Sequence, residues 1–463
     1  MSQFKIPFGG RAHNYTEDEI ESVVSVMRTG GTLTQGAHRV EFEERLKSYS
    51  GAANAFVVNS ATSALELAAT LCQLDSKAEI VIPGHTFTSS AYPFAKHGVK
   101  IVWADIDSKT HVVSLAQIEK LVSEQTRAIL VPHLYGYGCD MNPIREFAAQ
   151  KDLILIEDAA QAFGVDVDNQ KVGTFGDFGI FSFHSHKNIT TLGEGGALLV
   201  KDDALADLVP TLRHNGHCSF SEPRDDYWIP AMGNLDIPQK DEKFLWPGNY
   251  CLGEAECALG TRLLKRADKI NSEKRKRAIQ FIDALAEFDE LRFVREDTRR
   301  HNYHLLAAEV IGIDRDAFIR RMAAHHRIQC VVQYYPLYRY PFYKKIGLGD
   351  ANCPFTDRYF DRMVSFPFSH LLDEAEIDLE ISPIDGLTLK RSLNTEGEQS
   401  VTGGEYTTGN FNFSSDNIEE GKLTSKGNFN FGGIDLSGMV DSNDGQILNT
   451  ELGFNYDNAL KGK

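Results

Sequence analysis

The chain has 463 residues, of which 42% are hydrophobic and 24% charged, a composition typical of globular proteins rather than of disordered chains. This length predicts two or three domains. The formal net charge of −17 argues against nucleic acid as a partner, because phosphate binding requires a basic surface. The charge is uneven, since residues 371–463 hold 17 Asp and Glu against 6 Lys and Arg.

The cysteines and the N-terminal segment indicate the cellular compartment of the protein. Seven cysteines are scattered along the chain without a CxxC pair, which favours reduced thiols over a disulfide or zinc framework. The first residues, MSQFKIPFGG, contain no apolar leader, and no apolar run reaches the ~18 residues of a membrane span. We therefore expect a cytoplasmic protein without a metal centre and without a membrane partner.

Residues 56–200 repeat a pattern of short apolar strand, turn and helix. Strands are expected at 55–60, 79–84, 100–106, 127–136 and 153–159, and helices at 61–72, 114–124 and 142–152. Nearly continuous apolar strands that alternate with helices indicate a mostly parallel sheet covered on both faces, which is an α/β fold. In such sheets, ligands bind at the carboxyl ends of the strands.

The rest of the chain predicts a smaller domain and a distinct tail. One long charged helix is expected from 251 to about 288, then a strand at 303–310, a helix at 315–326 and a strand at 328–335. After residue 383 the motif GNFNF occurs at 409–413 and again at 427–431, in a Gly-, Ser- and Asn-rich context that suggests β-hairpins or partial disorder. The predicted division is 1–250 (large domain), 251–383 (small domain) and 384–463 (tail).

Several polar residues follow the predicted strands. Asp158 is the second residue of an acidic pair, Glu157 and Asp158, that directly follows the apolar run LILI; it is either a solvated acid or a buried carboxylate that needs a cationic partner, such as a protonated pyridine nitrogen. Gln161 lies three residues further on. The segment VVNSATSALELA takes a strand into a helix, whose free N–H groups either bind a phosphate or receive ordinary caps. Phe87, in IPGHTFTSS, is either a core residue or a platform for a flat heterocycle.

Lys187 lies in FSFHSHKNITTLGEGGALLV, a polar segment between two apolar runs. A lysine in such a place is usually a solvated surface residue. The glycines that follow allow close backbone approach, however, and an amine there suits a Schiff base with an aldehyde cofactor. Ser182, five residues earlier, is placed to add a hydrogen bond to a phosphate.

Together, EDAAQAFG, GDFGIFSFHSHKNITTLGEGGALLV, IPGHTFTSSA and PGNYCLGEAECALG resemble the DegT/DnrJ/EryC1/StrS sugar aminotransferases. The resemblance covers roughly residues 5–379. It implies the aspartate aminotransferase fold (type I), in which a large domain with a mixed, mostly parallel sheet carries a smaller α+β domain. It also implies pyridoxal 5′-phosphate as cofactor, with pyridoxamine 5′-phosphate as the intermediate form.

The resemblance also implies a role for each matching residue. Lys187 would form the Schiff base and move protons, and Asp158 would hold the pyridinium nitrogen. The other implied cofactor contacts are Gln161 (phenolic oxygen), Phe87 (ring stacking), Ala61, Thr62 and Ser182 (phosphate), and Asn249 (phosphate of the neighbouring subunit). A homodimer with shared active sites follows. Lysine at position 187 separates the chain from dehydratases of the family, which carry histidine there.

The chain departs from the family pattern at three places. Cys251 replaces an arginine that is common after NY, so the anion contact from that position is not expected here. The segment 214–247 is longer than usual and is expected to reshape the substrate entrance, and the motif TTLGEGG has one residue more than the common TTGEGG.

The reaction implied is transfer of an amino group from an amino acid, most simply L-glutamate, to a keto- or aldehydo-sugar. A nucleotide-linked keto-deoxyhexose, used for cell-surface polysaccharide or lipopolysaccharide, is the first expectation. An unlinked acid, 8-oxo-3-deoxy-octulosonate going to 8-amino-3,8-dideoxy-manno-octulosonate, is the alternative. A non-catalytic binding protein on the same fold is a third reading. His304, Tyr334 and Tyr338 are candidates for the sugar site, with packing as an equal alternative for the tyrosines.

Overall fold

In the computed structural model of the chain, the described residues are 4–9, 13–220, 230, 232–240, 242–286, 288–369 and 371, together with short strands between 405 and 435. The chain divides into two compact units, Met1–Leu372 and Asp373–Lys463. All residues predicted for the site belong to the first unit. The three-part division expected from the sequence stays a prediction.

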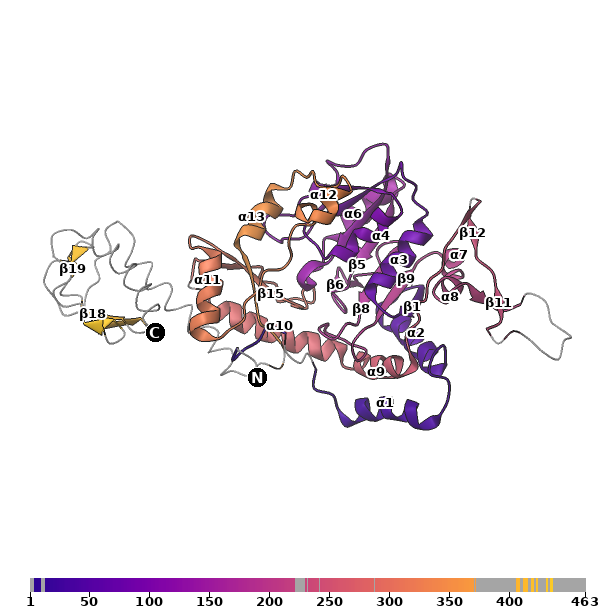
Figure 1. Ribbon diagram of the computed structural model, residues 1–463, viewed down its shortest axis with the longest axis horizontal. Helices are drawn as coiled ribbons and strands as arrows, with labels where there is room; N and C mark the ends of the chain where they lie inside the picture. The colour runs from indigo at the N-terminus through magenta and orange to yellow at the C-terminus, as the bar shows by residue number, and fades with distance from the viewer. Residues whose placement is uncertain are drawn as a thin grey trace. The chain divides into compact units, whose positions relative to one another are not determined.

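A seven-stranded sheet forms the centre of the first unit (Figure 1). Its order is β1 (Asn54–Val58), β9 (Gly196–Val200), β8 (Phe178–Ser182), β5 (Ile154–Asp158), β4 (Thr126–Pro132), β2 (Glu79–Pro83) and β3 (Lys100–Ala104). Strand β9 is antiparallel to both β1 and β8, and the other pairs are parallel. The mixed, mostly parallel sheet predicted from the sequence is confirmed.

Helices cover both faces of this sheet. Alternate residues of one strand enter different apolar cores: Val81 packs in one, while Ile80 and Ile82 pack in the other. The first core contains residues of α2 (Ala37–Ser50), α5 (Leu115–Ile118), α6 (Met141–Gln150) and α9 (Glu254–Leu264). The second contains residues of α3 (Ala61–Cys72), α4 (Tyr92–Lys96), α7 (Asp203–Ala206) and α8 (Val209–Leu212). Burial on both sides explains why the strands are apolar throughout.

Helix α3 positions the first site segment. Ser60 is its N-cap, and the Ser60 hydroxyl accepts a hydrogen bond from the backbone N–H of Ser63. The apolar residues at 64, 65, 67, 68 and 71 are buried, which packs the helix against the sheet beside β8 and β9. The start of α3 is therefore held at the end of β1.

The single long helix expected at 251–288 is two helices, α9 and α10 (Ala267–Ala284), which lie end to end (Figure 1). The prediction of one helix was wrong because the backbone of Arg266 leaves the helical conformation. The Arg266 guanidinium donates to the carboxylate of Glu19, in α1 (Glu17–Thr29), and to the carbonyl of Asn14. This interaction fixes the break and ties the N-terminal segment to the domain.

A small antiparallel sheet, β14 (Leu291–Phe293), β15 (Leu306–Val310) and β16 (Met363–Phe366), follows these helices. The helical elements beside it are α11 (Arg315–Arg321), a π-type turn (Met322–His326), α12 (Pro341–Lys345) and α13 (Pro354–Arg362). The strand expected at 328–335 is absent: that segment makes only isolated bridges, from Ile328 to Ile6 and from Val331 to Ser365. Strand β16, missed in the sequence, takes the place beside β15.

The long insert at 214–247 contains two short hairpins within its described part. They are β10 (His217–Cys218) with β11 (Asn234–Leu235), and β12 (Gln239–Lys240) with β13 (Lys243–Phe244). Another short hairpin pairs β6 (Asp166–Val167) with β7 (Gln170–Lys171). The Lys and Arg residues of the insert are Arg224, Lys240 and Lys243, of which Arg224 lies outside the described residues.

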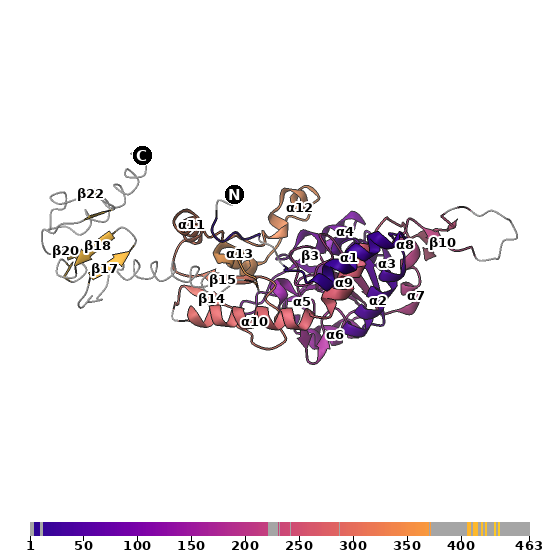
Figure 2. The same cartoon turned by 90° about the horizontal axis from the view of Figure 1, so that it is seen from below.

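The second unit contains β17 (Glu405–Thr408), β18 (Phe411–Ser414), β21 (Asn430–Phe431) and β22 (Ile434–Asp435) in one antiparallel sheet, and a separate pair, β19 (Ile418–Glu419) with β20 (Lys422–Leu423) (Figure 2). The two GNFNF motifs pair with each other, since Phe411 is opposite Phe431 and Asn412 is opposite Asn430. The repeat is therefore a pair of strands that are not consecutive in the chain, since β19 and β20 lie between them.

Candidate active site

The site lies along one edge of the central sheet. Strands β1, β8, β5 and β2 run in the same direction, so their carboxyl ends, and the residues that follow them, share an edge. Asp158 and Ser182 end β5 and β8, the start of α3 follows β1, and Lys187 lies in the connection from β8 to β9. Residues from distant parts of the sequence therefore meet at one place.

Asp158 is a buried carboxylate, 8% exposed. Its Oδ2 accepts a hydrogen bond from the Ser90 hydroxyl at 2.6 Å, and its Oδ1 accepts one from the backbone N–H of Ala160 at 3.2 Å. The neighbouring Glu157 has a structural role, because its carboxylate contacts His133 and accepts the backbone N–H groups of Gly173, Phe175 and Gly176. Of the acidic pair, Asp158 is the residue that belongs to the site.

Lys187 brings an amine to the same place. Burial lowers the pKa of Lys187 to about 8, although the nearby Asp158 charge acts in the opposite direction. Its Nζ lies 3.5 Å from Nε2 of His304, and its backbone carbonyl lies 2.8 Å from Nε2 of His13. Asp158 ends β5 and Lys187 follows the neighbouring strand β8, so the two residues predicted to carry the chemistry lie at the same edge of the sheet, where the Asp158 charge acts on the amine.

Gln161 connects three parts of the site. Its Oε1 accepts the backbone N–H of Tyr135 at 2.7 Å, and its Nε2 donates to the Tyr334 hydroxyl at 3.0 Å. Burial raises the pKa of Tyr334 to about 12, so this phenol keeps its proton at neutral pH. The Phe87 ring lies edge-on to Tyr334, with centroids 5.8 Å apart, and is 49% exposed. The partly exposed Phe87 ring thus offers an aromatic face beside Tyr334.

The start of α3 forms a cradle with β8 and β9. Ser182 pairs with Gly196 in the sheet, and Gly196 also pairs with Val58 at the end of β1. A Cβ atom on Gly196 would lie 2.5 Å from the backbone nitrogen of Ala61, so only glycine allows this approach. The first N–H groups of a helix have no partner within the helix. The start of α3, with the amides of Ala61 and Thr62, therefore lies against Gly196, the sheet partner of Ser182, and a helix start of this kind suits an anion.

The profile of the DegT/DnrJ/EryC1/StrS aminotransferase family matches residues 13–382. The chain belongs to this family. It is a pyridoxal-phosphate-dependent sugar aminotransferase of the type I fold.

Individual relatives and solved structures agree with this assignment. The chain is 30% identical over 391 residues to the L-glutamine:2-deoxy-scyllo-inosose aminotransferase of Streptomyces kanamyceticus, covering 78% of this chain and 89% of the relative. It is 34% identical over 252 residues to the GDP-perosamine synthase of Caulobacter vibrioides, covering 54% and 63%. The structure of Helicobacter pylori PseC, an aminotransferase of pseudoaminic acid biosynthesis, superimposes with a TM-score of 0.74 at 23% identity, over 83% of this chain and all of PseC, and shows the fold.

Within the chain, Tyr338 packs in the core, and Asn249 lies beside the residue that precedes the N-cap of α3. Tyr338 is buried in the core beside Trp103 and over Gly84, and its hydroxyl donates to Asp357 at 2.5 Å. Its contacts are those of a packing residue, the alternative considered for it, and we leave it out of the proposed sugar site. Asn249 is exposed, and its carbonyl accepts a hydrogen bond from Asn59 at the end of β1.

Sequence reasoning missed several residues that the aminotransferase fold brings to the site. Ser90 lies within the quoted IPGHTFTSSA motif, three residues after Phe87, so its position was a usable signal. His13 and Lys274 had no such signal, because His13 is near the N-terminus and Lys274 lies in the charged run SEKRKR. The tertiary fold alone places them beside Lys187 and Asn188.

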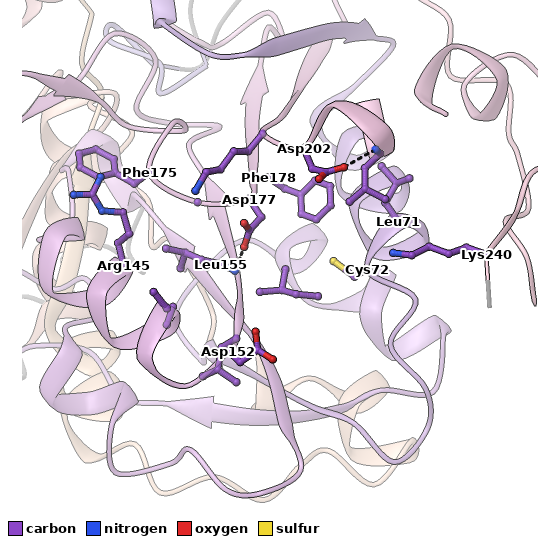
Figure 3. A pocket seen from close by; sticks show the side chains of 17 residues that line it. Leu71, Cys72, Arg145, Asp152, Leu155, Phe175, Asp177, Phe178, Asp202 and Lys240 are labelled. Carbon is purple, nitrogen blue, oxygen red and sulfur yellow. Dashed lines mark hydrogen bonds between the residues drawn. The ribbon is translucent and has the colours of Figure 1, made fainter. Parts of the chain in front are cut away.

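A pocket of about 430 Å³ occurs at the opposite edge of the sheet (Figure 3). Its lining includes Ile154 and Phe178, the first residues of β5 and β8, whereas Asp158 and Ser182 end those strands. In this pocket Asp177 accepts the backbone N–H of Leu155 (Figure 3). The residues predicted for the cofactor do not line this pocket. Lys240 does, so within the chain this insert cation lies away from the Lys187 site.

Proposed function

We propose that this sugar aminotransferase moves an amino group from L-glutamate to a nucleotide-linked keto-deoxyhexose, for a cell-surface polysaccharide or lipopolysaccharide, in the cytoplasm. The observation that supports the catalytic part is that the buried Asp158 carboxylate and Lys187 follow the neighbouring parallel strands β5 and β8 at one edge of the sheet. The name of the Caulobacter relative, GDP-perosamine synthase, supports a nucleotide-linked sugar. The Streptomyces relative is named for L-glutamine, which makes glutamine the competing donor. In the described part of the chain, no helix has the length and apolar character of a membrane span.

The residues present fit pyridoxal phosphate. The approach of Gly196 to Ala61 forms a cradle that a Cβ would fill, next to Ser182. We propose that Ala61, Thr62 and Ser182 bind the phosphate, since helix N-termini favour anions. The negative charge of a phosphate would interact favourably with the positive end of α3.

Asp158 is proposed to hold the ring nitrogen. Two of its lone pairs are used by Ser90 and Ala160, and the carboxylate has others with which to accept an N–H. The negative charge of a buried carboxylate beside the ring nitrogen would stabilise the protonated form of the pyridine. When bound, the cofactor supplies an electron-withdrawing ring that stabilises negative charge at the substrate carbon.

Gln161 and Phe87 are proposed to orient the ring. One N–H of the Gln161 amide is used by Tyr334, which leaves the second N–H for the phenolic oxygen of the cofactor. The exposed Phe87 ring offers an apolar surface for stacking. Because Gln161 is itself held by the Tyr135 backbone, its amide is fixed before a ligand arrives.

Lys187 is proposed to attach the cofactor and to move protons at the substrate carbon. A pKa of about 8 leaves a substantial neutral fraction of its amine near neutral pH, and only the neutral amine accepts a proton or acts as a nucleophile. His304 lies beside the amine and Tyr334 contacts Gln161, so both remain candidates for the sugar contacts.

We also propose a homodimer with shared active sites. The exposed Asn249 is held at the β1 end by the bond from Asn59 to its carbonyl, and this leaves its side chain to reach a neighbouring subunit. Sedimentation or light scattering of the purified chain tests the oligomer. An Asn249→Ala variant that binds the cofactor as tightly as the wild type would contradict the shared site.

The function is tested by incubating the full chain and pyridoxal phosphate with L-glutamate or L-glutamine, and with a panel of acceptors. The panel contains GDP-, UDP- and dTDP-linked keto-deoxyhexoses, free keto-sugars and 8-oxo-3-deoxy-octulosonate. The amino product is identified by mass, and Lys187→Ala is the negative control. Amination of a free sugar acid in preference to every nucleotide-linked acceptor would refute the substrate proposal.

A further inference from the structure

The imidazole of His304 is buried beside the Lys187 amine in a way that none of the roles above explains. The residue is 7% exposed, and its Nε2 lies 3.5 Å from Nζ of Lys187, at the long end of hydrogen-bond distance. Its Nδ1 is also buried and finds no hydrogen-bond partner among the residues that the structure describes. Within the described part of the chain, the ring therefore has one polar contact, which is the amine.

The position of this ring is fixed by its backbone. The His304 N–H donates to Oδ1 of Asn302 at 3.0 Å, and the His304 carbonyl accepts from Nζ of Lys274 at 3.0 Å. The same Lys274 Nζ donates to Oδ1 of Asn188 at 3.0 Å, and Asn188 directly follows Lys187. One buried lysine thus ties the segment that carries the imidazole to the segment that carries the amine.

The unpartnered Nδ1 indicates which nitrogen of His304 carries the proton. Burial and the charges of Lys187 and Lys274 hold the pKa of His304 well below its ordinary value, so the ring is neutral, with one donor and one acceptor nitrogen. If Nδ1 carried the proton, a buried N–H would have no partner. If Nε2 carries it, only an acceptor lacks a partner, and buried unpaired donors are the rarer case. The Nε2–H tautomer is therefore favoured.

We propose that His304 is a positioning residue whose Nε2–H donates a hydrogen bond to the lone pair of the Lys187 amine and so holds that amine in its unprotonated form. The inference rests on the proposed role of Lys187 in attaching the cofactor. An ammonium group has no lone pair, so this bond exists only with the neutral amine. The neutral amine is also the form that reacts with an aldehyde.

Other charged and titratable groups act on the same pair. The Asp158 charge favours the ammonium form of Lys187, and the positive charge of Lys274 lowers the pKa of His304. His184 and His186, in the same connection as Lys187, also oppose a charge on the imidazole. Burial, together with the Lys187 charge, lowers the pKa of Lys274 to about 7, so its repulsion is strongest below neutral pH. The hydrogen bond from His304 opposes the effect of Asp158.

The experiment measures the pKa of Lys187 in the full chain freed of cofactor. Trace acetic anhydride acetylates neutral amines, and mass spectrometry of the peptide with Lys187 gives its labelling as a function of pH. His304→Phe removes the donor and keeps a buried ring, and it is expected to raise the pKa by about one unit, a roughly tenfold smaller neutral fraction at pH 7. His304→Gln, which returns an N–H, is expected to restore much of the wild-type value.

The matched control is His301→Phe, in the same segment. His301 is also buried, but its ring stacks on Tyr303, with centroids 3.8 Å apart, and its Nδ1 accepts the Tyr303 backbone N–H. This variant is expected to leave the Lys187 pKa unchanged. A lower or unchanged Lys187 pKa in His304→Phe overturns the proposal, because an imidazole that accepts from an ammonium would give the lower value.

A second measurement reads the tautomer in the wild-type protein itself. Nitrogen NMR of wild-type protein with labelled histidine distinguishes the two neutral tautomers, and the His304 signals are assigned by their loss in His304→Gln. The Nδ1–H tautomer overturns the proposal. Attachment of the cofactor to Lys187 is checked separately by borohydride reduction and peptide mass. If attachment fails, the proposed function is wrong, while the pKa shift still reports on the hydrogen bond.

Discussion

The Ser90 hydroxyl donates a 2.6 Å hydrogen bond to Oδ2 of Asp158, and this bond joins two residues that are 68 positions apart in the sequence. Ser90 ends the short 3₁₀ helix η1 (Thr88–Ser90) after β2, whereas Asp158 ends β5. The bond fixes the rotation of the carboxylate, and so it determines which lone pairs face a ligand. Asp158 is thus oriented by a residue that also lies close to Phe87 in the chain.

Ser90→Ala is expected to weaken the binding of pyridoxal phosphate about tenfold or more. Hydrogen bonds to charged groups contribute about 1.5–3 kcal/mol, and the alanine leaves the buried carboxylate short of one donor. Cofactor titration followed by absorbance measures the change. Ser22→Ala is the control, because the buried Ser22 hydroxyl makes a bond of similar length to a helix carbonyl in α1. Equal affinities for Ser90→Ala and wild type would contradict this role of Ser90.

Lys187→Ala is expected to abolish both covalent attachment of the cofactor and amino transfer. The amine is the group in the site that reacts with an aldehyde, and alanine has none. The measurements are the visible absorbance of the purified protein and the mass of the peptide after borohydride reduction. Lys265→Ala, at the C-terminal end of α9, is the control and should keep both signals. An unchanged spectrum in Lys187→Ala would refute the assignment.

Gly196→Ala is expected to lower both stability and cofactor affinity. The new methyl group would lie 2.5 Å from backbone atoms of Ala61 and Ser60, and overpacking of this kind typically costs about 1–3 kcal/mol. Gly193→Ala, in the segment that leads into β9, is the matched control, because a Cβ on Gly193 would meet no atom within 4 Å. Thermal unfolding and cofactor titration compare the two. Similar losses in both variants would show that the cradle is not responsible.

The pH dependence of cofactor uptake follows from the lowered pKa of Lys187. The neutral amine fraction increases as the pH rises through about 8, so the uptake rate of the cofactor-free enzyme should rise to that pH and flatten about one unit above it. A lysine of ordinary pKa would continue to gain rate towards pH 10.5. Stopped-flow absorbance measures the rate, and acetyl-lysine amide in the same buffers corrects for ionisations of the cofactor itself. A profile like that of the free lysine would contradict the shifted pKa.

Removal of residues 392–463 is expected to leave amino transfer unchanged. Every site residue belongs to the unit Met1–Leu372, and the strands of the acidic tail belong to the other unit. Activity and oligomer size are measured for the truncated and full chains side by side. A loss of activity with an unchanged oligomer would place part of the tail in the catalytic reaction, whereas a smaller oligomer would give it a role in assembly.

The sequence by itself determined the fold class and led to the prediction of Lys187 and Asp158 as the central residues of the site. The strands from β1 to β5 are apolar throughout because both faces of the sheet are covered, and this pattern is local enough to be read directly. Lys187 and Asp158 could be predicted because each follows an apolar strand within a recognisable motif. The α3 cradle was also readable, since its serine cap and small residues are neighbours in the chain.

Only the tertiary structure decided which residues surround the Lys187 amine. Lys274 lies in a charged run that carries no motif, and His304 was expected at the sugar rather than beside the amine. The hydrogen bond from Ser90 to Asp158 likewise joins segments that are distant in the sequence. The break at Arg266 and the replacement of the expected strand at 328–335 by β16 have the same origin. In each case the partner is distant in sequence, and local propensity contains no information about a contact that only the packed fold creates.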